Sequence, residues 1–508
     1  MSIPSYRTSA SELGGGRTVI LLLLFALAMY QFYSAGFGAF ATICILPVLV
    51  IVTALTLRYR MFLFWALVIV NYLISMKTIP WPSGIPISLY NEGLEILLLL
   101  MAIIDVKDTK FEWTLNAMFA ALLVWCAFVT LELMNDTCGM AWDFGAWYAG
   151  ARLMAFQLLY AFIVFTLYLN TTNKLKKYLL LWGGLALFSV VWLWKQKYFG
   201  FTEAENEFIQ GPGRPTHILS GGSLIRYLSI YTDAAAAGIG MASTSVAFII
   251  FGLTTKVKKY KYIYLVIGFA CVWGFFATGT RTAVACFMAG FLAYTVLSKS
   301  YKMTIAISVA GLLFFFMLAF TQIGDGNQMI RRMRTAFNKN DASAGARKAN
   351  QEVMKKYLRD APFGIGVGLR KGDIAKNHKY YIMSAIPPDS EYVFIWIHTG
   401  AVGITLFLIT TVIMFLGASR IIMFKLTSSS LRGIGAGLAC AFVAMQLGGY
   451  GNQVLMQFPN CVVCYGGLTI VYILPFIEKE WIAHEDKLLD VQTENERIKA
   501  EKKKASRV

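Results

Sequence analysis

Apolar runs of about 17–25 residues, the length that crosses the hydrocarbon core of a bilayer as a helix, recur along this chain. Short polar or charged connections separate them. The pattern predicts spans near residues 18–35, 38–57, 61–77, 90–105, 113–133, 151–170, 178–194, 233–253, 260–277, 281–298, 303–322, 390–418, 433–449 and 460–477. The sequence therefore predicts an all-α polytopic membrane protein with about fourteen transmembrane helices.

The charges in the connections predict the orientation of these spans. Connections 79–89, 134–150 and 450–459 contain no Lys or Arg, whereas the alternate connections are basic. Basic connections stay in the cytoplasm, so both termini are predicted to be cytoplasmic, in a bacterial inner membrane. The basic connections carry Arg58, Arg60, Lys107, Lys110, Lys174, Lys176, Lys177, Lys256, Lys258, Lys259, Lys261, Lys299, Lys302, Arg420, Lys425 and Arg432.

The composition is typical of a membrane protein, and the distribution of the charges argues against nucleic-acid binding. Hydrophobic residues make up 57% of the 508 positions and charged residues 15%, yet the net charge is +18. Because the basic residues gather in the cytoplasmic connections and in one long loop, membrane lipids or a phosphorylated substrate explain the excess without nucleic acid. Cys461 and Cys464 form a CxxC at the start of a span, where a structural role is expected. The first apolar run is too long for a signal peptide and is expected to act as an uncleaved anchor.

The predicted domain layout contains two long outer loops. It comprises a cytoplasmic N-terminus at 1–17, transmembrane helices 1–11 at 18–322, a large periplasmic loop at 323–389, transmembrane helices 12–14 at 390–477 and a charged cytoplasmic tail at 478–508. The second outer loop is 195–232. The large loop has thirteen Lys and Arg against six Asp and Glu. Its residues 343–359 are good helix formers, and Pro362–Gly368, with glycine at alternate positions, is predicted to be a turn or loop.

Charged residues at the predicted outer ends of spans are the candidates for chemistry, since each is costly near hydrocarbon. Arg281 lies in a turn between two spans that needs Gly279 but no arginine, and Arg226 and Arg347 lie in the outer loops. Guanidinium groups in one outward cavity suit phosphate oxygens, and a lipid-linked diphosphate is the obvious membrane ligand. The alternative is that these arginines extend to lipid headgroups. Asp389 and Glu391 open the twelfth predicted span.

Three segments, in order, resemble the O-antigen ligase and O-antigen polymerase superfamily of membrane glycosyltransferases. Ala277–Ala283 (ATGTRTA) is similar to its Thr-Gly-Ser-Arg-Gly-Ala turn. Ala346–Gly368 resembles its arginine, short helix and Pro-x-x-Gly-x-Gly loop, and Pro388–Gly403 its His-Asn-x-Tyr-Leu entry and Gly-x-x-Gly span. Asp233–Gly238 weakly resembles an Asn-centred entry to an earlier span. The resemblance covers roughly 210–410.

The resemblance implies a GT-C-like glycosyltransferase that inverts the anomeric centre and uses neither metal nor cofactor. Its donor would be an undecaprenyl-diphosphate-linked oligosaccharide at the periplasmic face, and its acceptor a glycan or the lipid A core. Arg281 and Arg347 match the family's diphosphate arginines, and Arg226 is expected to assist them. The favoured function is O-antigen or exopolysaccharide polymerase, with a chain-length regulator as a candidate partner. O-antigen ligase and lipid-linked glycan transporter are the alternatives.

The resemblance also predicts where the catalytic base lies. Asp389 stands where the family usually has a histidine, and a carboxylate is a weaker base than imidazole unless burial raises its pKa. Glu391 is predicted to share this catalytic role, and His378 in the large loop is an alternative. His398 lies nine residues further along, on the opposite helix face and about 13 Å deeper, so packing is expected there. A transporter should instead use ionisable residues within spans, for which Glu95, Arg152 and His398 are candidates.

Overall fold

The computed structural model describes residues 59–81, 86–107, 109–219, 224–323, 328–334, 342–370, 372–386 and 390–505, with residues 23, 25, 26, 29, 30, 326 and 388. Nearly all of the two predicted spans at 18–35 and 38–57 lies outside the described residues, as does Asp389. The chain divides into two units, Met1–Trp65 and Ala66–Val508. The first contains few described residues, so the account below concerns the second.

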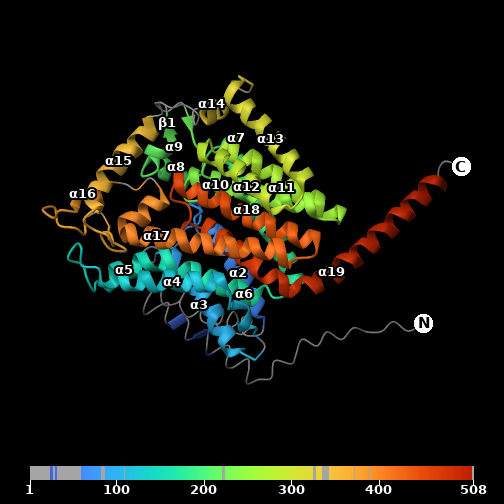
Figure 1. The fold of residues 1–508 in the computed structure, drawn as a ribbon, viewed down its shortest axis with the longest axis horizontal. Coiled ribbons are helices and arrows are strands. Elements are labelled where there is room, and N and C mark those ends of the chain that lie inside the picture. The colour runs from blue at the N-terminus through green and yellow to red at the C-terminus, as the bar shows by residue number, and fades with distance from the viewer. Residues whose placement is uncertain are drawn as a thin grey trace. The chain divides into compact units, whose positions relative to one another are not determined.

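The described chain is almost entirely helical (Figure 1). The helices are α2 Arg60–Leu73, α3 Ser88–Ile104, α4 Ala117–Leu131, α5 Phe144–Ala151, α6 Gln157–Tyr168, α7 Thr172–Tyr198, α8 Glu203–Gln210, α9 Arg214–His217, α10 Ala234–Thr254, α11 Lys258–Ala277, α12 Arg281–Leu297, α13 Tyr301–Phe320, α14 Gln328–Arg334, α15 Ala342–Leu358, α16 Tyr381–Ala385, α17 Glu391–Arg420, α18 Ser429–Gly451 and α19 Asn460–Ala505. Short 3₁₀ or π segments are η1 Phe111–Thr114, η2 Glu132–Met134, η3 Arg152–Phe156 and η6 Ile421–Lys425. The strands β1 Ile218–Leu219 and β2 Leu224–Ile225 pair antiparallel.

Within the described residues, eight helical segments are long and apolar enough to cross a membrane. They are Ala117–Met134, Phe144–Tyr168, Thr172–Tyr198, Ala234–Thr254, Lys258–Ala277, Glu391–Lys425, Ser429–Gly451 and Asn460–Lys499. Shorter apolar helices cover Arg60–Leu73, Arg281–Leu297 and Tyr301–Met317. These segments confirm the helical, polytopic membrane class. The total of about fourteen spans stays a prediction.

Helix α10 is the centre of the bundle, and its residues 234–252 are all buried. It packs against α11, α12 and α18, which lie beside it in Figure 1. Small residues permit this close packing, because a side chain on Gly268 of α11 would collide with Ile249 and one on Gly437 of α18 with Phe251. Asp233 caps the start of α10 by accepting hydrogen bonds from two backbone amides. The backbone before α10 is therefore held firmly at this end of the bundle.

Helix α17 is interrupted at Gly400, whose φ of 65° is left-handed and suits glycine. The predicted loop Pro362–Gly368 fills the interruption by bonding to the helix backbone. The three bonds are Ile365 N to Ile397 O (2.9 Å), Gly366 N to His398 O (3.1 Å) and Val402 N to Pro362 O (3.1 Å). Backbone groups released by the break thus find partners in the loop.

Glycine is required where this loop meets α17. A Cβ atom on Gly364 would lie 2.5 Å from the backbone nitrogen of Gly400 and 2.6 Å from the carbonyl oxygen of Ile397. The prediction that Pro362–Gly368 is a loop is therefore confirmed, as is the predicted helix near 343–359, which is α15.

Candidate functional site

Three arginines from different segments meet at the turn between α11 and α12. Gly279 adopts a left-handed φ of 64° there, and Arg281 is the first residue of α12. Arg226 donates from Nη2 to the hydroxyl of Thr280 at 2.9 Å, and Arg332 of α14 donates from Nε to the carbonyl of Gly279 at 2.9 Å. The structure therefore brings together two of the three predicted arginines, Arg226 and Arg281, and adds Arg332. We call this group the arginine turn.

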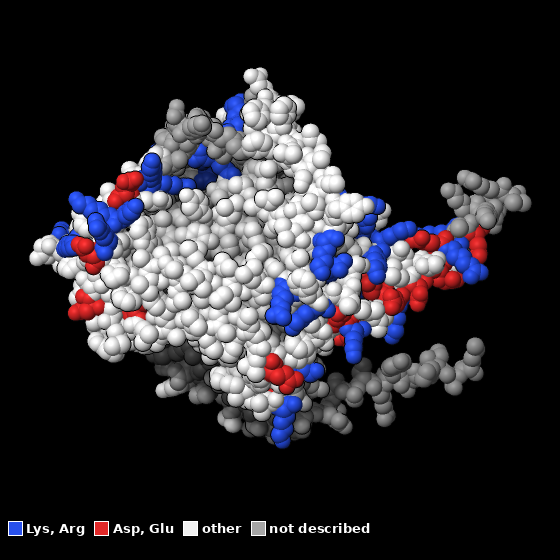
Figure 2. All heavy atoms as spheres, viewed as in Figure 1, with Lys and Arg blue, Asp and Glu red and all other residues white. Residues whose placement is uncertain are grey.

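The electrostatics of the arginine turn favour an anionic ligand. Burial, together with the positive charges of Arg332 and Arg281, lowers the pKa of Arg226 to about 10, and Asp233 opposes this shift. The Nε atom of Arg226 is buried and has no hydrogen-bond partner among the described residues. Figure 2 shows Lys and Arg atoms in a recess of the surface below the places of β1 and α14 in Figure 1. A phosphate oxygen would satisfy the unpaired donor and relieve the repulsion.

Lys77 belongs to the same electrostatic environment. Burial lowers the pKa of Lys77, while the charge of Asp233 raises it, and its Nζ lies 4.4 Å from the centre of the Phe208 ring. His217, nearby, has both ring nitrogens occupied: Nε2 accepts from the backbone amide of Ala234 at 3.2 Å, and Nδ1 lies 2.9 Å from the carbonyl of Gly213. These contacts make His217 a structural residue rather than a base.

The connection between α18 and α19 links the arginine turn to the segment that carries Asp389. Two of its side chains make the joining hydrogen bonds: Asn452 Nδ2 to Thr282 Oγ1 (3.1 Å) and Gln453 Nε2 to the carbonyl of Pro388 (2.8 Å). Thr282 follows Arg281 directly, and Pro388 directly precedes Asp389. The α18–α19 connection therefore contacts both the residue after Arg281 and the residue before Asp389.

Glu391 has a structural contact at the start of α17. Its buried carboxylate accepts a hydrogen bond from the backbone amide of Leu455 at 2.9 Å. This contact holds the α18–α19 connection against α17, which favours a positioning role. The catalytic role predicted for Glu391 stays a prediction.

The two histidines considered as bases lie in different environments. His398 is buried, with Nδ1 2.8 Å from the carbonyl of Phe394 and Nε2 3.2 Å from that of Leu369. We call the loop Pro362–Gly368 the glycine loop. His398 therefore anchors Leu369, which directly follows this loop, to α17, in agreement with the packing role expected for it. His378 is half-buried and accepts from the backbone amide of Tyr380 at 3.3 Å.

Arg347 lies on the inward face of α15. It shares this face with Met354 and Leu358, seven and eleven residues further along, which are buried in a cluster that includes Ile397 of α17. Among the described residues, no hydrogen bond or ion pair joins Arg347 to the arginine turn. Its place in the site stays a prediction, although the face that it occupies is the one that packs toward α17.

Sequence reasoning did not single out Arg332 or the α18–α19 connection. In the sequence Arg332 cannot be told apart from its neighbours Arg331 and Arg334. Only the folded position of α14 shows that it is Arg332 that bonds to Gly279. The connection had a weak signal, since it contains Asn452, Gln453 and Gln457 in a very apolar part of the chain. Within the described residues, no group of three or more His, Cys, Asp or Glu side chains is arranged to hold a metal ion.

These features define a helical, multi-pass bacterial membrane protein with a basic site between helix ends. Residues 263–408 match the O-antigen ligase family, which confirms the resemblance to the O-antigen ligase and polymerase superfamily. The matched region contains Arg281, Arg332, Arg347 and the glycine loop, whereas Arg226 precedes it. No curated protein matches the chain. The family match supports a function in membrane glycan transfer.

Proposed function

We propose that this protein transfers undecaprenyl-diphosphate-linked oligosaccharide at the periplasmic face of the inner membrane, most specifically as an O-antigen or exopolysaccharide polymerase. The observation that carries the proposal is the meeting of Arg226, Arg281 and Arg332 at one turn, with a buried guanidinium nitrogen of Arg226 that has no partner among the described residues. The O-antigen ligase match, which includes Arg281 and Arg332, supports it.

In the proposed reaction, an acceptor hydroxyl attacks the anomeric carbon of the donor sugar from the face opposite the diphosphate. The bond between that carbon and the diphosphate oxygen breaks, and lipid diphosphate leaves with the electron pair. The arginine turn stabilises the negative charge that develops on the leaving group. The hydroxyl proton passes to a base, and the anomeric configuration inverts. In this scheme the arginines perform the electrostatic work without a metal ion.

Asp389 is the proposed base. It directly follows Pro388, whose carbonyl accepts a hydrogen bond from Gln453. Two other candidates, Glu391 and His398, make hydrogen bonds that favour structural roles for them. In a transfer assay on purified protein, Asp389→Asn should reduce the rate by about 10²–10⁴ and leave donor binding intact. Asp389→His should retain activity. Glu391→Gln and His378→Ala are measured alongside, and wild-type turnover by Asp389→Asn would exclude it as the base.

The ligase alternative fits the family match equally well, because the donor and its diphosphate are the same. A glycan profile of a deletion strain separates the two. Single repeat units attached to the acceptor, with long chains lost, indicate a polymerase, whereas complete chains left on the lipid carrier indicate a ligase. An unchanged profile would contradict both.

The transporter alternative rests on a buried polar network between α3 and the α5–α6 region. Arg152 contacts Glu92 at 3.4 Å, and Gln157 donates to Glu95 at 2.7 Å. Buried ionisable residues of this kind are common in transport pathways. Here each carboxylate has an internal partner, which also fits a structural network. Flipping of lipid-linked glycan by proteoliposomes, lost in Glu95→Gln, would favour this alternative.

A further inference from the structure

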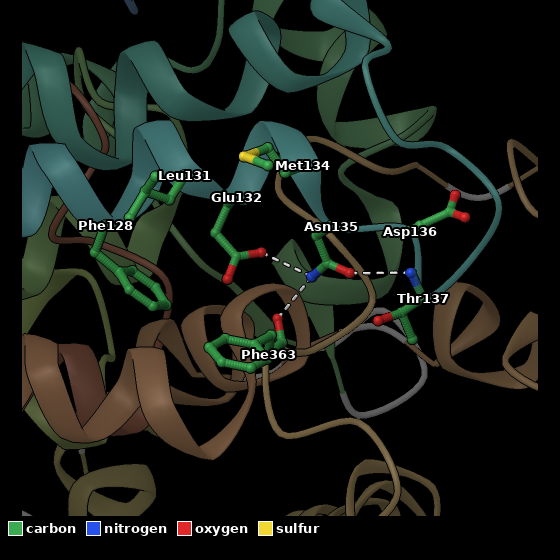
Figure 3. A pocket seen from close by; sticks show the side chains of 8 residues that line it. All are labelled: Phe128, Leu131, Glu132, Met134, Asn135, Asp136, Thr137 and Phe363. Carbon is green, nitrogen blue, oxygen red and sulfur yellow. Dashed lines mark hydrogen bonds between the residues drawn. The ribbon is translucent and has the colours of Figure 1, made fainter.

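A cavity of about 480 Å³ lies at the end of α4 (Figure 3), and none of its lining residues belongs to the arginine turn. It is lined by side chains of the segment from Phe128 to Thr137 and by Phe363 of the glycine loop. The reaction scheme above does not use it. Its volume is within the range of sites for small molecules, and most of its lining is apolar with a few polar groups that converge, as such sites commonly are.

The polar groups of the cavity form a fixed arrangement. The side-chain amide of Asn135 donates to Glu132 Oε2 at 2.8 Å and to the carbonyl of Phe363 at 2.9 Å, while its oxygen accepts from the amide of Thr137 at 3.0 Å. Asn135 therefore ties the end of α4 to the glycine loop. Figure 3 shows the Glu132 carboxylate between the side chains of Phe128 and Phe363, facing the space between the two rings.

We propose that this cavity binds a sugar ring of the acceptor glycan. The inference rests on the proposed function, for which it supplies the acceptor side. A buried carboxylate can accept two sugar hydroxyls, and the phenyl rings of Phe128 and Phe363 can pack against the C–H face of a ring. A polyprenyl tail is a poorer occupant of this cavity. It would leave the second oxygen of the Glu132 carboxylate buried without water or a hydrogen-bond partner.

The charge of the cavity separates it from the donor site. It is lined by Glu132 and Asp136, and none of its eight lining residues is Lys or Arg. A diphosphate would find no cationic partner here, whereas it would be attracted at the arginine turn. The two sites therefore select opposite chemistries: an anionic leaving group at one and a neutral or cationic, hydroxyl-rich ring at the other.

The glycine loop connects this cavity to α17. Phe363 belongs to the loop whose backbone bonds to Ile397, His398 and Val402 at the interruption of α17. The part of α17 before the interruption begins at Glu391, two residues after Asp389, and extends about 13 Å to Gly400. An acceptor chain held at Phe363 would thus be bound by the same backbone unit as the start of α17, two residues after the proposed base in the sequence.

The test compares Glu132→Gln and Phe363→Ala with Phe316→Ala, a control on α13. Phe363 and Phe316 are 50% and 56% exposed, so truncating either side chain should leave the fold intact. The probe is the oligosaccharide released by mild acid from the host's own surface polysaccharide. Its binding to the full-length protein in nanodiscs is measured by saturation-transfer NMR. Donor binding and transfer kinetics are measured on the same samples.

We expect Glu132→Gln to weaken oligosaccharide binding by about 10–100-fold and Phe363→Ala by about 10-fold, with the acceptor KM raised and donor affinity unchanged. Phe316→Ala should behave as wild type. Unchanged oligosaccharide affinity in both cavity variants, or loss of donor-lipid affinity instead, overturns the acceptor site. If the cavity variants lose oligosaccharide binding but the wild-type protein transfers no glycan, the acceptor site stands and the proposed transferase function fails.

Discussion

Arg226→Gln should reduce donor binding without destabilising the protein that lacks its ligand. Lowering the pKa of Arg226 to about 10 makes its charged form less favourable by about 3 kcal/mol in the folded state. Partial exposure of the side chain reduces this to about 1–3 kcal/mol. The penalty applies at every pH below about 10 and fades only as the pH rises further, so it is fully present at neutral pH.

The substitution also removes two hydrogen bonds, to Thr280 Oγ1 and to the carbonyl of Thr216. Bonds from a charged donor contribute about 1.5–3 kcal/mol each when fully formed and less at a partly exposed site. The two effects are of similar size and opposite sign. We therefore expect the thermal stability of the unliganded protein to change little.

Donor binding should respond differently. Loss of one guanidinium–phosphate contact costs about 1.5–3 kcal/mol, which weakens donor binding by about 10–150-fold. The assay measures thermal unfolding of the purified protein in nanodiscs, with and without lipid-linked donor purified from the host, and donor affinity on the same preparation. Donor should raise the unfolding temperature of wild-type protein and have little effect on Arg226→Gln.

Arg152→Gln is the matched control, because Arg152 is also an arginine largely withdrawn from solvent but has a carboxylate partner. Its Nη1 lies 3.4 Å from Glu92 Oε2, and both side chains are buried. Removing one member of a buried pair typically costs about 3–5 kcal/mol, so this variant should lose stability. If Arg226→Gln loses as much stability as Arg152→Gln and keeps wild-type donor affinity, Arg226 is structural and the reasoning for the diphosphate site is wrong.

Three further predictions follow from the predicted orientation, the arginines and the glycine loop. Reporter fusions after residues 350 and 500 should give opposite signals, and matching signals would contradict the predicted orientation. Arg281→Ala and Arg347→Ala should nearly abolish product, and lysine at either position should restore little because it lacks the bidentate fork; full activity at wild-type expression would exclude that arginine. Gly364→Ala should greatly reduce the yield of folded protein, since its Cβ would lie 2.5 Å from the nitrogen of Gly400, whereas Gly345→Ala, in open space, should express normally.

The sequence predicted the features that depend on local chemistry. Apolar runs identify spans because their length matches the bilayer, and Pro362–Gly368 was identified as a loop because glycine at alternate positions disfavours regular structure. Arg281 was identified because a turn around Gly279 does not require arginine. In each case the signal lies within a few neighbouring residues.

Features that depend on distant partners were not predictable in this way. The interruption of α17 at Gly400 is hidden in a continuous apolar run, and its hydrogen bonds come from residues about 35 positions earlier. Arg332 differs from Arg331 and Arg334 only in the direction that α14 gives it. The cavity at Glu132 needs Phe363, more than two hundred residues away, to complete its lining.

The α18–α19 connection explains how the arginine turn can be rigid while it awaits a ligand. Its polar side chains and backbone bond to Thr282 of α12, the carbonyl of Pro388, Glu391 of α17 and Thr232 before α10. Asn460, the first residue of α19, adds a hydrogen bond to the carbonyl of Ala236 in α10. Most of these bonds join neutral amides, hydroxyls and carbonyls, so their strength does not depend on whether a charged substrate is bound. Helix ends fixed in this way fit an Arg226 nitrogen that is buried and unpaired among the described residues, because its neighbours cannot move to satisfy it. Such fixed donors would be effective in the proposed reaction, since the charge of a leaving diphosphate would meet them without rearrangement of the protein.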